Sequence, residues 1–155
     1  MITAWRLASS DFAGSTDQLL SGEGAALYGG RWNSPGIAAV YTSGSLALAA
    51  MELLVHLGRA QLLLTYRQMP VYIAESLVMH LSVDDLPVDW AIPAISPITQ
   101  AIGDQWLLSQ ESAVLQVPSV VVPQEYNFIL NPEHADFEEL EFGSIVDCRF
   151  DERLL

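Results

Sequence analysis

Glu52 is a lone carboxylate in a segment, residues 45–57, that is otherwise almost entirely apolar. On a helical wheel at 100° per residue, Ser45, Glu52 and His56 fall within about 40° of one another. A carboxylate on a mostly buried helix is costly unless it is paired, hydrogen-bonded or faces a water-filled cleft. Two interpretations stay open, a carboxylate in a pocket and a core carboxylate paired with His56 or an arginine. A metal site is disfavoured, because two ligands without an HExxH motif are too few.

A second candidate is the segment 28–36, which reads Tyr-Gly-Gly-Arg-Trp-Asn-Ser-Pro-Gly. Glycines allow a ligand to approach the backbone, Arg31 offers a planar fork for phosphate, and Trp32 offers a stacking or packing surface. It is not a P-loop, because the GK[ST] ending is absent. The residues alone favour an ordinary glycine-rich turn with a surface arginine, and for Arg6 they favour a salt bridge over an anion site. A lone serine such as Ser112 is more often a cap or turn residue than a nucleophile.

Composition limits the classes of function. The chain has 155 residues, and its six basic residues, all arginines, face nineteen acidic ones, for a net charge of −13. Such a surface repels phosphate backbones, so nucleic-acid binding and docking on anionic lipid are not expected. Cys148 is the only cysteine, and neither a signal peptide nor an 18-residue apolar run is present, which favours a soluble, cytoplasmic protein. The mean hydropathy of +0.30 suggests apolar surface buried in an interface, so we expect a homodimer.

The elements that must position these residues form one α+β domain spanning residues 1–155. Ser43 or Ser45 as N-cap and Gly58 after the last turn predict a helix over 45–57, and its nearly all-round apolar surface predicts that it is buried. Ser96 followed by Pro97 predicts a second helix from Pro97 to about Gln110. Strands are predicted at 3–7, 37–42, 71–78, 113–117, 120–122, 128–130 and 145–150.

Four segments in this order resemble the RES-domain family over nearly the whole chain. They are the 28–36 segment, Val40-Tyr41-Thr42-Ser43 running into Ala49–His56, the later Ala113–Ser119, and Asn127–Pro132. RES proteins are toxins of bacterial type II toxin–antitoxin modules, encoded beside an Xre-like antitoxin, and are named for an arginine, a glutamate and a serine. By resemblance these positions are Arg31, Glu52 and Ser112, with Tyr41 as the accompanying aromatic residue.

The resemblance implies a fold similar to that of ADP-ribosyltransferase toxins and an activity that consumes NAD. NAD is then the substrate, and neither a cofactor nor a metal is expected. Arg31, helped by Arg6, would bind the pyrophosphate, and Tyr41 would pack against nicotinamide. Glu52 would stabilise the cationic ribose in the transition state, while Ser112 would orient Glu52 or a ribose hydroxyl.

The acceptor of the ribosyl group stays open at this point. Hydrolysis (NAD glycohydrolase) leads, because Ala50 stands where transferases that modify arginine usually carry a Glu or Gln. Phosphorolysis comes second and protein ADP-ribosylation third. A catalytically silent module that binds an antitoxin is the alternative from another class, since the acidic surface would suit a basic partner. The antitoxin is expected to cover the NAD cleft or to insert a terminal segment into it.

Overall fold

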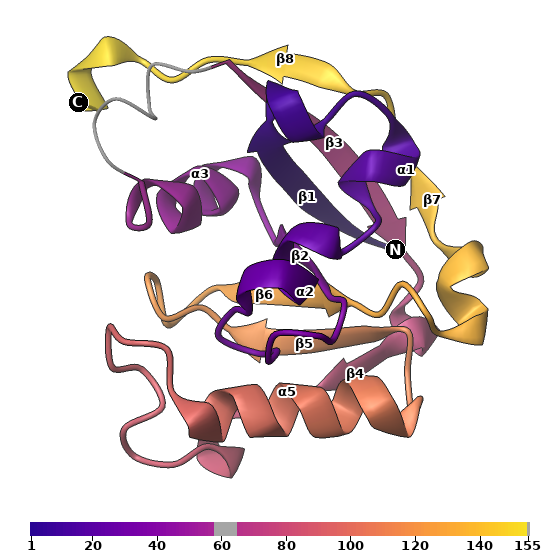
Figure 1. Cartoon of the computed structure of the whole chain (residues 1–155), viewed down its shortest axis with the longest axis vertical. Helices are drawn as coiled ribbons and strands as arrows, with labels where there is room; N and C mark the ends of the chain where they lie inside the picture. The colour runs from indigo at the N-terminus through magenta and orange to yellow at the C-terminus, as the bar shows by residue number, and fades with distance from the viewer. Residues whose placement is uncertain (58–64, 155) are drawn as a thin grey trace.

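The computed structural model describes residues 1–57 and 65–154. Its centre is one eight-stranded sheet in the order β4-β5-β6-β2-β1-β3-β7, with β8 also pairing with β3 (Figure 1). All pairs are antiparallel except β4 with β5. The strands are β1 (Ile2–Ser9), β2 (Val40–Ser43), β3 (Tyr66–Ile73), β4 (Val78–His80), β5 (Val114–Pro118), β6 (Tyr126–Leu130), β7 (Glu141–Phe142) and β8 (Val146–Cys148).

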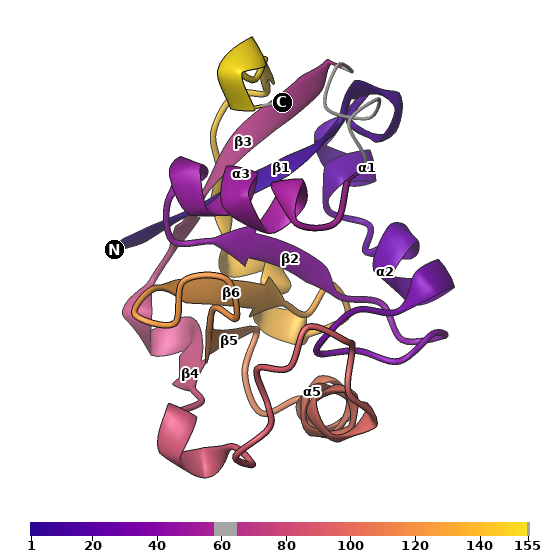
Figure 2. The ribbon, with the colours of Figure 1, turned by 90° about the vertical axis from the view of Figure 1, so that its left-hand side faces the viewer.

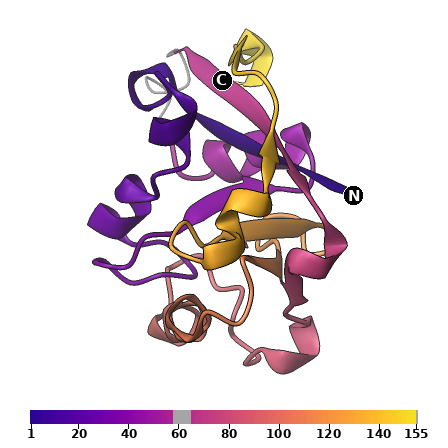
Figure 3. The ribbon, with the colours of Figure 1, turned by 90° about the vertical axis from the view of Figure 1, so that its right-hand side faces the viewer.

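Short helices and turns connect and cover the strands. The described α-helices are α1 (Thr16–Leu19), α2 (Glu23–Tyr28), α3 (Leu46–Leu54) and α5 (Pro97–Ser109). Single 3-10 turns lie at Ser10–Phe12, Glu75–Leu77, Val83–Asp85, Ala135–Glu139 and Glu152–Leu154. The helix α3 lies beside β1 and β2, α5 lies at the other end of the sheet, and the C-terminal segment runs along β3 (Figures 1 and 3). No helix in the described ranges is long and apolar enough to cross a membrane.

The sheet parts between β1 and β2. The strand β1 pairs with β3 over eight residues, from Ile2 opposite Ile73 to Ser9 opposite Tyr66. It pairs with β2 at a single position, Trp5 opposite Ser43, while β2 pairs with β6 along its whole length. Past that position β1 and β2 diverge, and Figure 2 shows the two groups of strands crossing at an angle. Side chains on the diverging ends therefore face a space that regular pairing would have closed.

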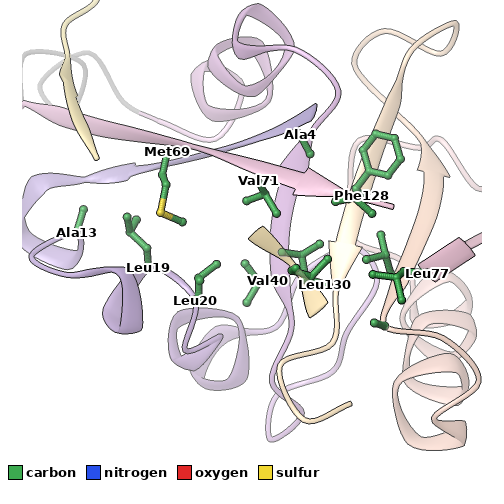
Figure 4. Packing of buried hydrophobic residues seen from close by; sticks show 14 residues of the cluster. Ala4, Ala13, Leu19, Leu20, Val40, Met69, Val71, Leu77, Phe128 and Leu130 are labelled. Carbon is green, nitrogen blue, oxygen red and sulfur yellow. The ribbon is translucent and has the colours of Figure 1, made fainter. Parts of the chain in front are cut away.

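Burial follows the two-residue alternation of the strands. Along β2, Val40 contributes to a core on one face with Phe128, Leu130, Met69 and Val71 (Figure 4). Tyr41 points to the other face, where it packs on a second core around Trp32, Trp90, Trp106, Leu107, Leu115, Val117 and Ile129. A third cluster, Leu7, Ala49 and Tyr66, lies under α3. The face with Tyr41 is the one that holds the candidate site.

The two predicted main helices are present. Ser96 accepts a hydrogen bond from Ile98 N–H, Pro97 opens α5, and Gln110 ends it in the left-handed conformation at φ 61°. For α3 the N-cap is Ser45, which accepts from Leu48 N–H. The helix ends at Leu54 rather than at 57, and the predicted Gly58 cap lies outside the described residues.

The prediction that this helix is buried all round is wrong. Met51 is 44% and Val55 58% exposed. The helix packs with one side on the sheet, and no described element covers its outer side, which an apolar pattern alone does not reveal.

Strand prediction succeeded where pairing partners are regular and failed at the ends. The predicted 3–7, 113–117 and 128–130 strands fall within or within one residue of observed ones. The predicted 37–42 strand begins only at Val40, and 71–78 is the end of β3, a 3-10 turn and the start of β4. Residues 120–122 form no strand, because the N–H groups of Val121 and Val122 donate to the Ser119 hydroxyl instead of to a neighbouring strand.

Candidate active site

A pocket of about 460 Å³ opens where β1 and β2 diverge, between α2, α3 and the 28–36 segment. Arg6 on β1, Arg31, Tyr41 on β2 and Glu52 on α3 all line it. Four of the five site residues named from the sequence therefore share one cavity, although 46 positions separate the first from the last. The fifth, Ser112, is not among the residues that line it.

Glu52 is held by two donors through the same oxygen. Its Oε1 accepts from Ser119 Oγ at 2.6 Å and from Asn127 Nδ2 at 2.7 Å. No described arginine or histidine forms an ion pair with it, and His56 lies one turn further along α3 on the pocket wall. The interpretation of Glu52 as a core carboxylate paired with a cation is therefore wrong, and the carboxylate faces the cavity.

The expectation that Ser112 orients Glu52 needs correction. Ser112 Oγ accepts from Trp106 Nε1 at 2.8 Å and donates to the carbonyl of Val114 at 2.9 Å, so it ties the end of α5 to the start of β5. The serine beside Glu52 is Ser119, which is fully buried just beyond the end of β5. Ser112 precedes and Ser119 follows the five-residue strand β5, and only Ser119 contacts α3.

Asn127, the second donor to Glu52, was not identified from the sequence. It stands in β6 directly opposite Ser43 of β2, and its Oδ1 accepts from Ser43 Oγ at 2.7 Å. The sequence did place Asn127 in a segment, Asn127–Pro132, that resembles the RES-domain family. A single asparagine in a strand, however, gives no local reason to expect a site residue.

Arg31 holds the 90–93 segment, which leads to the pocket-lining Ile95. Its Nη1 donates to the carbonyl of Trp90 at 3.1 Å, and its Nη2 donates to the carbonyls of Ile92 and Pro93 at 3.0 and 3.4 Å. Its Nε donates to no described residue, so the fork keeps N–H capacity for a ligand. Desolvation lowers the pKa of Arg31, while the nearby charge of Glu52 acts in the opposite direction.

Tyr41 connects the sheet to the loop that carries Arg31. Its hydroxyl donates to Asn33 Oδ1 at 2.6 Å and accepts from the N–H of Trp32 at 3.1 Å. Asn33 is fully buried, and its amide donates to the carbonyls of Ala25 and Ile37. Burial raises the pKa of the Tyr41 phenol well above its usual range, so it stays neutral. Because the hydroxyl is committed to the loop, the ring is the part of Tyr41 left for a ligand.

Arg6 lies on the other side of the parted strands. Its Nε donates to the carbonyl of Leu19 at 2.9 Å and its Nη1 to that of Leu7 at 3.4 Å, whereas Nη2 donates to no described residue. No carboxylate of residues 1–57 or 65–154 forms an ion pair with it, so the salt-bridge interpretation is not what the structure shows. Burial lowers the pKa of Arg6 to about 10, which leaves it protonated at neutral pH. A desolvated cation without a counter-ion favours an anionic ligand.

These groups define what the pocket can do chemically. Two guanidinium groups can hold phosphate or another anion, an aromatic face can pack on a flat ring, and a carboxylate can stabilise a developing positive charge. In the described part of the chain, no three His, Cys, Asp or Glu side chains group together in a way that could hold a metal ion. The pocket is therefore suited to an anionic ligand with a flat ring and a centre that becomes cationic.

The domain is a mixed α+β fold with a parted sheet and few helices. The chain belongs to the RES domain family, whose model matches residues 3–151. It is 43% identical over 136 residues to "Toxin Res" of Photorhabdus laumondii, covering 83% of this chain and 86% of the relative. It is 35% identical over 154 residues to the "Prs ADP-ribosylating toxin" of a Sphingobium strain, covering 97% and 95%.

A solved structure shares the fold. The chain superimposes on a chain from the crystal structure of the M. tuberculosis MbcT–MbcA toxin–antitoxin complex with a TM-score of 0.75 and 21% sequence identity. The match covers 96% of this chain and 84% of that one. The expected fold class is thereby confirmed.

Proposed function

We propose that this protein is the toxin of a type II toxin–antitoxin module and that it cleaves the nicotinamide–ribose bond of NAD in the cytoplasm. The observation that carries the proposal is Glu52, fixed through one oxygen beside a cavity that also holds Arg31, Arg6 and the ring of Tyr41. NAD brings a pyrophosphate for the guanidinium groups and a flat ring for Tyr41. It also brings a ribose that becomes cationic as the bond breaks.

The proposed step begins with the glycosidic bond lengthening. The C1′–N bond breaks, its electron pair goes to the pyridinium nitrogen, and nicotinamide leaves as a neutral molecule. The positive charge passes to the ribose, where the Glu52 carboxylate stabilises it. Water adds its oxygen to C1′ and loses a proton, which gives ADP-ribose. Because the ribose carries its charge only near the transition state, Glu52 acts mainly on kcat.

The chain's own residues prepare this step before chemistry begins. Arg6 and the free Nε of Arg31 bind the pyrophosphate, and charge-assisted hydrogen bonds are about twice as strong as neutral ones. Tyr41 packs its ring on nicotinamide while its hydroxyl keeps the Arg31 loop in place. Substitution of a preorganised group such as Glu52 typically lowers the rate by about 10²- to 10³-fold.

The acceptor is the finer part of the proposal. Water leads, because Ala50 stands two residues before Glu52 and offers no second acidic group to bind a protein side chain. Phosphorolysis follows, and protein ADP-ribosylation is kept as a candidate because one relative is named a Prs ADP-ribosylating toxin. NMR spectra recorded over time with NAD and the chain, made in a cell-free system without antitoxin, distinguish the products. ADP-ribose supports hydrolysis, a 1-phosphate ester supports phosphorolysis, and protein-linked ADP-ribose supports transfer.

An antitoxin is the proposed protein partner, because the structural neighbour was solved as a toxin–antitoxin complex. We propose an Xre-like antitoxin whose basic region meets this acidic chain and covers the pocket. Inhibition is then competitive with NAD, and a ternary complex with unchanged NAD affinity contradicts it. The free toxin is proposed to be a homodimer, and light scattering that gives a monomer at micromolar concentration refutes this.

A further inference from the structure

The two oxygens of Glu52 have different surroundings. Oε1 accepts two short hydrogen bonds, from Ser119 and Asn127, while no described residue donates to Oε2. Glu52 lines the pocket, and its Oε2 is not a buried atom lacking a partner. The carboxylate therefore has one oxygen fixed to the sheet and the other available to a ligand.

The direction of each hydrogen bond in this network is determined by its neighbours. Ser119 Oγ accepts from the N–H groups of Val121 and Val122, both at 3.1 Å, so its single proton goes to Glu52. Asn127 Oδ1 accepts from Ser43, so its NH₂ group, a pure donor, is the end that meets Glu52. Both neighbours therefore present hydrogens to Oε1.

The network is built on the part of the sheet that also carries Tyr41. Ser43 and Asn127 are directly opposite each other in the β2–β6 pair, and Tyr41 stands two residues before Ser43 on the same face. Regular strand pairing holds these positions on a rigid element of the fold, as preorganised catalytic groups require. The orientation of the carboxylate and that of the ring therefore depend on one rigid frame.

We infer that Asn127, oriented by Ser43, is a positioning residue that turns Oε2 of Glu52 toward the ribose C1′ and keeps Glu52 from rotating away. The inference rests on the proposed function, because it assumes that Glu52 stabilises a cationic ribose. Asn127 also lines the pocket, but its described hydrogen bonds join it to Glu52 and to Ser43. The inference is that Asn127 affects the rate through Glu52 and not through a contact of its own with the substrate.

The test is a double-mutant cycle between Asn127 and Glu52, with nicotinamide release from radiolabelled NAD as the readout. Asn127→Ala lowers kcat by about 10- to 100-fold while KM changes by less than about threefold, because an unfixed carboxylate loses transition-state stabilisation but not ground-state contacts. In the Glu52→Gln background the same change lowers kcat by less than about twofold. The matched control, Gln124→Ala, removes an exposed amide three residues earlier and leaves both constants unchanged.

The outcomes separate this inference from the function on which it rests. If Asn127→Ala lowers kcat equally in both backgrounds, its effect does not pass through Glu52 and the inference is wrong. If Glu52→Gln leaves nicotinamide release unchanged, the proposed function itself fails. If circular dichroism shows that Asn127→Ala is unfolded, the Ser43→Ala variant tests the inference instead. It keeps the amide but frees its orientation, so we expect a drop in kcat of about 3- to 10-fold that disappears in Glu52→Gln. A drop that persists there overturns the inference.

Discussion

Removal of the Tyr41 hydroxyl is expected to lower the stability of the fold more than the rate of NAD cleavage. Tyr41→Phe keeps the ring that faces the pocket but removes the group that bridges Asn33 Oδ1 and the N–H of Trp32. Asn33 is fully buried, so its oxygen gains no water in exchange. The substitution therefore removes the hydrogen bonds between sheet and loop while it keeps the aromatic ring for a ligand.

The expected magnitude follows from the two groups left without a partner. A buried polar group deprived of its partner costs about 1–3 kcal/mol. Asn33 Oδ1 bears this cost in full, and the N–H of Trp32, a residue only 3% exposed, adds to it. Together they destabilise the fold by roughly 2–4 kcal/mol, which for a chain of this size lowers Tm by roughly 5–15 °C. Because the ring is unchanged, kcat falls by less than about tenfold.

Thermal unfolding by circular dichroism measures the first number and nicotinamide release measures the second. Tyr126→Phe is the matched control, since the half-exposed Tyr126 hydroxyl makes no hydrogen bond to a described residue, and its Tm stays that of the parent. A Tyr41→Phe protein that is as stable as the parent yet loses cleavage entirely refutes the reasoning. The hydroxyl would then act on the substrate rather than on the loop.

Four further substitutions have distinct expected outcomes. Ser119→Ala lowers NAD cleavage by about 10-fold or more, because Glu52 loses a hydrogen-bond donor. Ser112→Ala, in contrast, lowers Tm and leaves kcat unchanged. Equal activities of the two variants in a nicotinamide-release assay contradict the assignment of Ser119 as the serine that holds Glu52. Arg31→Lys keeps the charge but loses the planar fork that binds three carbonyls at once. We therefore expect amide hydrogen exchange in residues 90–93 to accelerate and KM for NAD to rise about 10-fold. Unchanged exchange would show that Arg31 does not hold this segment. Gly103→Ala places a methyl group against the backbone of Trp32, next to Arg31. We therefore expect about 3 kcal/mol of destabilisation or an unfolded chain. A denaturation midpoint equal to that of the parent contradicts this packing.

Local signals in the sequence were sufficient for the elements with strong caps. Ser96 and Pro97 mark the start of α5, because capping and a fixed φ act within one turn. Glu52 could be selected because a carboxylate among apolar residues has an energetic cost wherever the chain leads. The exposure of Met51 and Val55 could not be predicted, since the apolar pattern does not say how many sides of a helix other elements cover.

The partners of Glu52 required knowledge of the strand order. Ser119 and Asn127 lie 67 and 75 residues after Glu52, and they reach it only because β5 pairs with β6 and β6 with β2. Ser112 and Ser119 are the same residue type at the two ends of one strand, so no local rule separates them. The carboxylate was therefore predictable from its own position, while the groups that orient it depend on long-range pairing.

Nicotinamide release from NAD by the purified chain, free of antitoxin, tests the central claim most directly. We expect the parent chain to release nicotinamide and Glu52→Gln to do so about 10²- to 10³-fold more slowly at an unchanged Tm, while Ser112→Ala keeps the parent rate. If the parent releases no nicotinamide at millimolar NAD over several hours, or if Glu52→Gln is as fast as the parent, the pocket does not carry out this reaction.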